Sequence, residues 1–391
     1  MIYFDNSATT LPDKDLVTAY QEIATEYFGN PSSAHRLGVK AALKLEEARN
    51  VCADCLGADT DEMIFTSSGS ESNNTAIKGL MLRKDLRDKH IITTNVEHAS
   101  VYETCKQLES LGCSVTYLPT NGEGCINLED VRMALRKNTV LVSVMYVNSE
   151  LGSIQPIADI GHLLSEFPAI HFHVDAVQAY GKLPLRPKEW KIDSLSLSAH
   201  KFHGLRGTGL LYLGKGTQLF SLINGGGQES GYRAGTENLA GIVAMSRAMQ
   251  KHQSEQEENY EHLASLKKYL IDGLMQIPGC VVNGPKGNSN GAPHIINFSL
   301  RRFKSQEILL LLDSHDIYVS KSSACSSKSD KPSRVLLAAG INEEVANSAI
   351  RISFSVYNTI EEVDKFLIAL QMIIVKQKIS QKNQAIDQYN G

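Results

Sequence analysis

The sequence predicts an α/β protein: a mostly parallel sheet covered by helices, followed by a smaller α+β domain. Short apolar runs rich in Val and Ile alternate with stretches of helical periodicity, and they occupy 63–66, 90–94, 114–118, 139–147, 170–176, 194–198 and 209–213. This alternation is typical of βαβ units whose strands are buried on both faces. Beyond a Gly-rich segment near 225, a polar helical region leads to further apolar runs at 280–283, 294–300, 317–320 and 350–355. These later runs predict the smaller domain.

The length of 391 residues suggests two or three domain-sized units. We predict a large domain over 15–258 and a small domain formed by 1–14 and 259–376. No repeat or low-complexity block interrupts this order. The last residues, 377–391, have no core-facing pattern, and we expect them to form a flexible tail.

Composition excludes some function classes. The net charge is -4, with 39 basic residues scattered among 43 acidic ones, so no basic face for nucleic acid is expected. The longest apolar stretch, 366–375, is interrupted by Gln371 and is shorter than the roughly 20 residues that cross a bilayer. The N-terminal residues do not resemble a secretory signal, and seven cysteines at irregular spacing indicate reduced thiols. We therefore expect a cytoplasmic protein with no membrane association.

Lys201 and Asp175 are the first candidates for chemistry. Lys201 follows the apolar run 194–198, and glycines lead from it into the next run. A lysine at a strand end is usually a solvated charge, but an apolar pocket makes its amine a nucleophile toward an aldehyde. Asp175 ends another run, where a carboxylate either caps a helix or pairs with a pyridinium nitrogen. Together the two residues favour pyridoxal phosphate over either feature alone.

A phosphate also needs donors, and Gly69 and Ser70 follow the strand at 63–66 where a helix begins. Backbone N–H groups at a helix N-terminus favour an anion, although Ser before Glu is also an ordinary helix cap. The Gly-rich segment 225–238 lacks the Lys-Ser/Thr pair of a nucleotide-binding P-loop. We therefore do not expect an ATP site.

Among the cysteines, Cys325 stands apart. Cys52 and Cys55 form a CxxC pair within a helical pattern, and no second pair completes a zinc site, so we expect no metal. Four others lie in or beside ordinary elements and are interpreted as packing residues: Cys105, Cys113, Cys125 and Cys280. Cys325 is surrounded by serines and lysines, which predicts an exposed loop. Lys321 and Lys328 favour its thiolate form.

The order of several motifs carries a family resemblance. The chain contains, in sequence, DNSATT, FGNPSS, FTSSGSES, EHAS, HVDAVQ, SAHK, GGGQESGYRAGTEN, SSACSS and IRIS. It resembles the NifS/IscS-like cysteine desulfurases of the class-V aminotransferase group over about 2–355. The resemblance implies the three-layer large domain of pyridoxal-phosphate transferases of fold type I. It also implies a homodimer that takes sulfur from L-cysteine and passes it to an acceptor protein.

The resemblance also implies a role for each matching residue. Lys201 would bind the cofactor covalently, Asp175 would pair with the ring nitrogen, and Gln178 would lie at the ring hydroxyl. His98 would stack on the ring and relay protons, Arg351 would bind the substrate carboxylate, and Cys325 would receive the sulfur. The phosphate would contact Ser70 beside Gly69, Ser198, His200 and, from the neighbouring subunit, Thr236.

Departures from the family pattern concern the cofactor edge and the cysteine loop. Where the family usually has Asn-Asn-Glu, this chain has Asn148, Ser149 and Glu150. Asn148 and Ser149 are cofactor-edge candidates on the resemblance. Ser70 replaces the more usual threonine, Leu205 and Arg206 replace Pro-Lys, and Ser322 replaces a glycine. The alternative functions are selenocysteine lyase, another pyridoxal-phosphate lyase or transaminase, and a non-catalytic scaffold of a sulfur-transfer complex.

Overall fold

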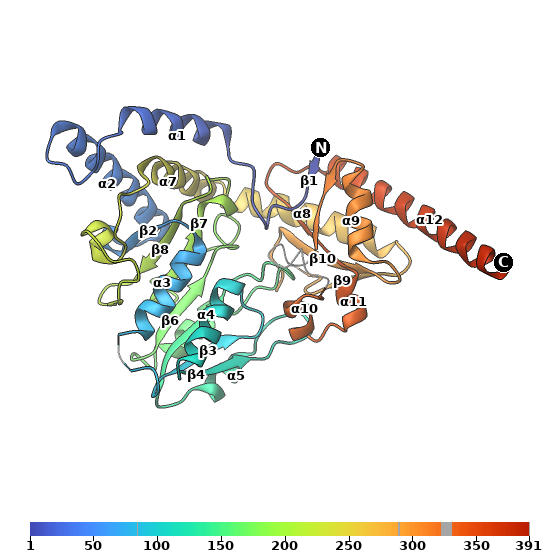
Figure 1. The fold of residues 1–391 in the computed structure, drawn as a ribbon, viewed down its shortest axis with the longest axis horizontal. Helices are drawn as coiled ribbons and strands as arrows, with labels where there is room; N and C mark the ends of the chain where they lie inside the picture. The colour runs from blue at the N-terminus through green and yellow to red at the C-terminus, as the bar shows by residue number, and fades with distance from the viewer. Residues whose placement is uncertain (84, 288–289, 322–330, 391) are drawn as a thin grey trace.

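The computed structural model describes residues 1–83, 85–287, 290–321 and 331–390, and from 377 onward only the backbone (Figure 1). A seven-stranded sheet lies at the centre of the larger part, with strand order β2-β8-β7-β6-β5-β3-β4. Its strands are β2 (Met63–Thr66), β3 (His90–Thr94), β4 (Ser114–Leu118), β5 (Thr139–Met145), β6 (His171–Asp175), β7 (Ser194–Ser198) and β8 (Gly209–Leu213). The five neighbouring strands β4, β3, β5, β6 and β7 are parallel, and β8 runs antiparallel to both β7 and β2.

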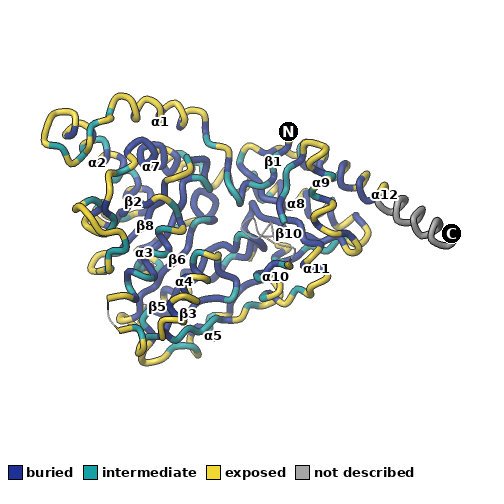
Figure 2. Tube along the Cα trace, viewed as in Figure 1, coloured by how far each residue is buried: buried dark blue, intermediate teal, exposed yellow. Residues whose placement is uncertain are grey.

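Helices cover both faces of this sheet, because successive strand residues point to opposite sides. Ile91 packs in a cluster with α3 and α4, whereas Ile92 belongs to the cluster that contains residues of α2, α6 and α7. The sheet strands are accordingly buried, and exposed residues lie along the outer helices (Figure 2). The helices of this part are α1 (Lys14–Glu26), α2 (Arg36–Leu56), α3 (Gly69–Met81), α4 (Ala99–Ser110), α5 (Leu128–Ala134), α6 (Ile157–Leu164) and α7 (Leu239–Ser254). The predicted three-layer, mostly parallel α/β fold is confirmed.

The smaller part contains an antiparallel sheet of order β12-β13-β10-β9 and a parallel pair formed by β1 and β11. Phe4, Phe298 and Phe366 meet edge to face in its core, so the N-terminal residues pack here. The strands are β1 (Ile2–Tyr3), β9 (Cys280–Asn283), β10 (Ile295–Leu300), β11 (Ile317–Tyr318), β12 (Ser320–Lys321) and β13 (Ala349–Ser353). The helices are α8 (Gln256–Met275), α9 (Ser305–Asp313), α10 (Arg334–Ala338), α11 (Glu343–Asn347) and α12 (Ile360–Asn390).

Three details differ from the expected elements. The run 317–320 forms two short strands with different partners, because β11 pairs with β1 whereas β12 pairs with β13. The helical region 237–275 divides at Glu255 into α7 and α8. The backbone of α12 continues to Asn390, through the segment expected to be a flexible tail. Its Lys, Gln and Ala residues are good helix formers, and extending an existing helix costs little. No helix within the described residues is long and apolar enough to cross a membrane.

Candidate active site

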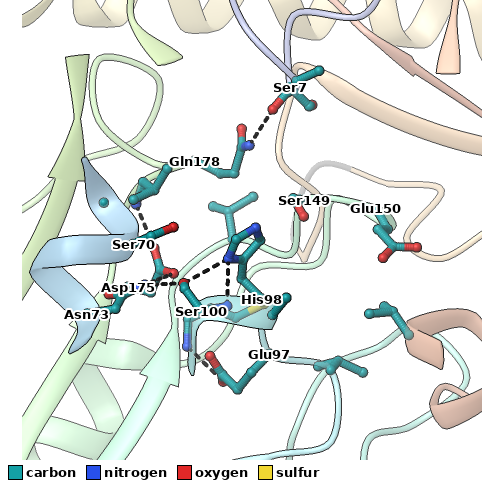
Figure 3. A pocket seen from close by; sticks show the side chains of 18 of the residues that line it. Ser7, Ser70, Asn73, Glu97, His98, Ser100, Ser149, Glu150, Asp175 and Gln178 are labelled. Carbon is teal, nitrogen blue, oxygen red and sulfur yellow. Dashed lines mark hydrogen bonds between the residues drawn. The ribbon is translucent and has the colours of Figure 1, made fainter. Parts of the chain in front are cut away.

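A cavity of about 600 Å³ lies beside the carboxyl ends of β6 and β7 (Figure 3). Arg351 of β13 also lines it. Ligands of parallel α/β sheets bind at this end of the strands, because loops and helix N-termini meet there. Most of the predicted site residues line this one cavity: Gly69, Ser70, His98, Ser149, Asp175, Gln178, Ser198, His200, Lys201 and Arg351. The fold therefore brings together residues from segments more than 280 positions apart.

Lys201 ends the 3-10 turn that follows β7. Its Nζ donates to the carbonyl oxygen of Ala8 at 2.9 Å and to that of Ser7, so the N-terminal segment closes over the amine. A second lysine stabilises this turn, because Lys182 Nζ donates to the Lys201 carbonyl oxygen at 2.8 Å. Burial, followed by the charge of Lys201, lowers the pKa of Lys182 to about 7. Lys201 therefore lies near a second lysine, and a neighbouring cation is one of the conditions that favour nucleophilic lysine chemistry.

Asp175 ends β6 and presents a carboxylate whose two oxygens both accept hydrogen bonds. Oδ1 accepts from the backbone N–H of Val177 at 3.1 Å, and Oδ2 accepts from Asn73 Nδ2 at 2.8 Å. A carboxylate that is fixed as an acceptor suits a protonated ring nitrogen. The neighbouring Gln178 donates from Nε2 to the Ser7 carbonyl at 2.9 Å, as Figure 3 shows.

The N-terminus of α3 forms an anion-binding corner of the cavity. Ser68 caps the helix by accepting from the N–H of Glu71, and Gly69 begins it. A Cβ atom at Gly69 would lie 2.6 Å from Val177 Cγ2, so only glycine fits this close approach. The first turn of a helix has unpaired N–H groups and a positive dipole end, which suit a phosphate.

The cavity carries further phosphate candidates beside this corner. Ser70, Ser198 and His200 also line it. Burial, with the nearby charges of Lys201 and Arg206, lowers the pKa of His200 to about 4, so its ring is neutral near pH 7. Its Nδ1 contacts the Thr9 hydroxyl at 3.2 Å.

Arg351 is the buried cation on the opposite side. Its side chain is 3% exposed; Nη2 pairs with Asp5 Oδ1 at 2.7 Å, and Nη1 donates to the Ser149 carbonyl at 2.9 Å. A guanidinium held in a fixed plane at a cavity wall can bind a carboxylate with two parallel hydrogen bonds. This placement agrees with the role that the resemblance implies for Arg351.

Two of the predicted site residues that the structure describes, Asn148 and Thr236, do not line the cavity. The side chain of Asn148 is buried in the adjoining turn, where Nδ2 donates to the Val96 carbonyl and Oδ1 accepts from the N–H groups of Glu150 and Leu151. Its amide is thus used to shape the turn, and the predicted contact with the cofactor edge stays a prediction. Thr236 is exposed and lies outside this cavity. Cys325 and Ser322 lie outside the described residues.

Several residues that line the cavity were missed by the sequence analysis. Asn73 and Ser100 lie one turn or less beyond predicted residues, and Ser7 lies in the DNSATT motif, to which no role was given. Glu97 and Glu150 are fully buried acids whose pKa values are raised by burial, that of Glu97 to about 8. The only available signal was their position beside His98 and Ser149. Burial of an acid cannot be inferred from such a neighbour.

The site as a whole fits pyridoxal phosphate. One cavity holds a lysine amine, an acceptor carboxylate and a glycine cradle at a helix N-terminus, which match the aldehyde, ring nitrogen and phosphate of this group. No cluster of three or more metal-ligating His, Cys, Asp or Glu side chains occurs among the described residues. Fold and site together define the class of pyridoxal-phosphate-type α/β enzymes.

Comparison with known proteins gives the family. The family model for class-V aminotransferases matches residues 2–366, and the chain belongs to this family. It is 46% identical to a NifS/IcsS protein homolog of Lactobacillus delbrueckii subsp. bulgaricus over 95% of this chain and 97% of that protein. It is 44% identical to the cysteine desulfurase IscS of Dictyoglomus turgidum over 96% of this chain and 95% of that protein. A solved NifS-like protein superposes with a TM-score of 0.90 at 38% identity, covering 96% of this chain and 99% of that one.

Proposed function

We propose that this protein is a pyridoxal-phosphate-dependent cysteine desulfurase. It removes sulfur from L-cysteine, forms L-alanine and holds the sulfur as a persulfide on Cys325 for transfer to an acceptor protein. The observation that carries the proposal is one cavity in which Lys201, Asp175, His98 and Arg351 converge. The similarity to cysteine desulfurases over nearly the whole chain supports it.

Residues of the large sheet would hold the cofactor. Asp175 would accept from the ring nitrogen, Lys201 would bind the aldehyde, and the α3 N-terminus with Ser70, Ser198 and His200 would hold the phosphate. When bound, pyridoxal phosphate supplies an electron-withdrawing ring that eases removal of the substrate's α-proton. Lys201 Nζ is the base that takes this proton, and His98 lies in the same cavity as a second proton carrier.

Arg351 would bind the substrate carboxylate and thereby orient the sulfur toward Cys325. The Cys325 thiolate then attacks that sulfur: the C–S bond of cysteine breaks, an S–S bond forms on the enzyme, and the carbon takes up protons to give alanine. The chain re-enters the described part at Lys331, which lines the cavity. Five residues lie between Lys331 and Cys325, so the sequence limits the distance between them to roughly 22 Å.

Substitution of Cys325 tests the proposal directly. In Cys325→Ala we expect normal cofactor and cysteine binding but loss of alanine production, because no other thiol has the required approach. Cys280→Ala is the matched control, since burial raises the pKa of Cys280 to about 12 and makes it inert. Alanine is quantified after incubation with cysteine, and persulfide is mapped by mass spectrometry. Near-normal turnover in Cys325→Ala, or persulfide only on another cysteine, would contradict this role.

Product analysis separates the alternative functions. A transaminase would give a keto acid, a selenocysteine lyase would prefer selenocysteine over cysteine, and a non-catalytic scaffold would stay colourless with pyridoxal phosphate. The acceptor is undetermined; iron–sulfur cluster assembly and tRNA or cofactor thiolation use the same persulfide chemistry. An affinity pull-down of the whole protein followed by identification of bound proteins addresses this question, as well as the predicted cytoplasmic location.

We also propose a homodimer with shared sites. Apolar side chains are exposed on α1, on α2 and on the segment between them, among them Val17, Leu43 and Phe28, which is typical of an interface. The exposed Thr236 would reach the partner's phosphate site. Mixing Thr236→Ala chains with Lys201→Ala chains should then restore cofactor affinity in one site of each mixed dimer, because that site has both residues. A monomer by light scattering with full activity would contradict the dimer.

A further inference from the structure

Asn73 is the centre of a buried hydrogen-bond network at the wall of the cavity. It lies in the second turn of α3 and is 1% exposed. Its Nδ2 donates to Asp175 Oδ2 at 2.8 Å and to Ser100 Oγ at 2.9 Å, and its Oδ1 contacts His173 Nε2 at 3.1 Å. Figure 3 shows Asn73 beside Asp175 and Ser100, at the side of the cavity where His98 lies. One amide thus connects two of the side chains proposed to face the cofactor.

The chemistry of its partners fixes the orientation of this amide. A carboxylate only accepts hydrogen bonds, so the nitrogen of Asn73 must face Asp175 and the oxygen must face His173. His173 Nε2 must then carry a hydrogen. Burial, with the adjacent His171, lowers the pKa of His173 to about 3, so its ring is neutral and its Nδ1 is an acceptor.

The same reasoning continues away from Asn73 along β6 and β7. His173 Nδ1 accepts from the Ser194 hydroxyl at 2.8 Å, which leaves the Ser194 oxygen to accept from His171 Nε2 at 2.7 Å. Every hydrogen in this chain therefore points from His171 through Ser194, His173 and Asn73 toward Asp175. Such one-way chains strengthen each member, and here they stabilise the carboxylate at the cavity.

The second branch leads from Asn73 to His98. Because Ser100 Oγ accepts from Asn73, its hydroxyl hydrogen is available for His98 Nδ1 at 2.8 Å. The backbone N–H of Ser100 also donates to this Nδ1 at 3.1 Å. A backbone N–H can only donate, so Nδ1 holds a lone pair and the hydrogen of the neutral ring is on Nε2. Ser100 thus determines the tautomer of His98 through its hydroxyl and its backbone N–H.

We infer that Asn73 is a positioning residue that fixes the proton arrangement of both Asp175 and His98. It acts through Asp175 and His98, and its effect on the reaction rests on the proposed function. One amide hydrogen keeps Asp175 an acceptor. The other directs the Ser100 hydroxyl hydrogen to His98 Nδ1, where it reinforces the Nε2–H form that the Ser100 backbone N–H also favours. A single polar side chain is thereby hydrogen-bonded to Asp175, proposed for the ring nitrogen, and through Ser100 to His98, proposed to stack on the ring.

The test compares Asn73→Asp with Asn74→Asp. The first keeps the shape of the side chain but replaces the donor by an acceptor next to Asp175. The second makes the same change one residue along α3, where Asn74 instead donates to the Ser70 carbonyl and accepts from Thr104. Asn73→Ser, which is smaller and uncharged, serves if Asn73→Asp does not fold. Circular dichroism and thermal melting establish that each variant is folded.

Two measurements are made. Nitrogen-15 NMR of labelled histidines in the cofactor-free protein, with His98→Gln to identify the signal, reports the His98 tautomer. Titration with pyridoxal phosphate gives the cofactor dissociation constant. We expect wild type and Asn74→Asp to show the Nε2–H form. Folded Asn73→Asp or Asn73→Ser should show a changed His98 signal and bind the cofactor roughly tenfold or more weakly, as loss of a charged hydrogen bond predicts.

An unchanged His98 signal together with unchanged cofactor affinity in a folded Asn73 variant would overturn the inference. So would a wild-type His98 protonated at Nδ1. Failure of the wild-type protein to bind pyridoxal phosphate would contradict the proposed function instead, and the His98 tautomer in the cofactor-free protein would still decide the inference.

Discussion

The cavity has two walls that are built differently. The cofactor wall, formed by 69–73, 98–100, 175–178 and 198–201, comes from strand ends and helix N-termini of one sheet. Its side chains are held by hydrogen bonds between neighbouring elements of the larger part, such as Asn73 to Asp175, and by hydrogen bonds of Gln178 and Lys201 to the N-terminal segment. The substrate wall consists of 149–150, Ser333 and Arg351. Asp5 supports it through the ion pair with Arg351, so four separate segments contribute. It is stabilised by a buried ion pair and by Glu150 accepting from Ser333.

This difference indicates a division of labour. The cofactor wall rests mainly on the large sheet, with a contribution from Ser7 and Ala8 of the N-terminal segment, so we expect the cofactor to bind even when Arg351 of the substrate wall is changed. The substrate wall depends on the N-terminal segment meeting β13, so substrate affinity should respond to changes far away in sequence. The following predictions test this independence.

The largest effect is expected for Lys201→Ala on the cofactor wall. The variant should fold, because the amine donates to two carbonyl oxygens of the N-terminal segment and truncation to Ala leaves the strands of the large sheet unchanged. It should bind no cofactor covalently and lose activity by roughly a factor of 1,000 or more, since both covalent binding and the general base are removed. Visible absorption and alanine formation check this result. Absorption from covalently bound cofactor in the purified variant would refute it.

Arg351→Lys should affect the substrate wall alone. The ammonium keeps the charge but loses the two-pronged contact with a carboxylate, so KM for cysteine should rise roughly 10- to 100-fold. The pyridoxal-phosphate dissociation constant should stay within about twofold. Steady-state kinetics and cofactor titration separate the two effects. If cofactor binding weakens as much as substrate binding, the two walls are not independent.

Glu97→Gln tests whether the cofactor wall contains a neutral buried acid. Burial raises the pKa of Glu97 from 4.5 to about 8, so between these pH values the folded protein holds a proton that the unfolded chain lacks. The free energy of unfolding of the wild type should therefore fall by about a few kcal/mol as pH rises from about 5 to 8. Gln cannot titrate, and its Oε1 can still accept from Thr94 and Met145 as Glu97 does.

Thermal melts of cofactor-free wild type and Glu97→Gln at pH 5 and pH 8 provide the measurement. The melting temperature of the variant should decrease less over this interval. Equal decreases in the two proteins would show that Glu97 is not protonated in the folded state.

The smallest effect is expected for Ser149→Asn, where the two walls meet. Ser149 lines the cavity, and its carbonyl accepts from Arg351. An amide side chain is longer than a hydroxyl and offers more hydrogen bonds, so we expect cofactor retention or rate to increase by roughly 2- to 10-fold. Cofactor titration and alanine formation measure this. If neither changes, the position 149 side chain does not touch the cofactor edge.

The sequence alone determined the fold class and most of the cofactor wall. Alternating apolar runs predicted the seven strands of the large sheet, because buried parallel strands require nearly continuous apolar residues. Lys201, Asp175 and Gly69 were identified since each follows a strand, where the fold itself aims side chains at a ligand. Local chemistry and strand order were sufficient for these residues.

Only the tertiary structure decided how distant segments contribute. Nothing near Asp5 in sequence indicates that it pairs with Arg351, 346 positions away. Asn148 matched a motif, yet its side-chain amide forms hydrogen bonds with backbone groups of the adjoining turn. Asn73 gave no signal because its role depends on partners from α4 and β6. Hydrogen-bond partners and burial are set by packing between elements, and a linear pattern records only the periodicity within each element.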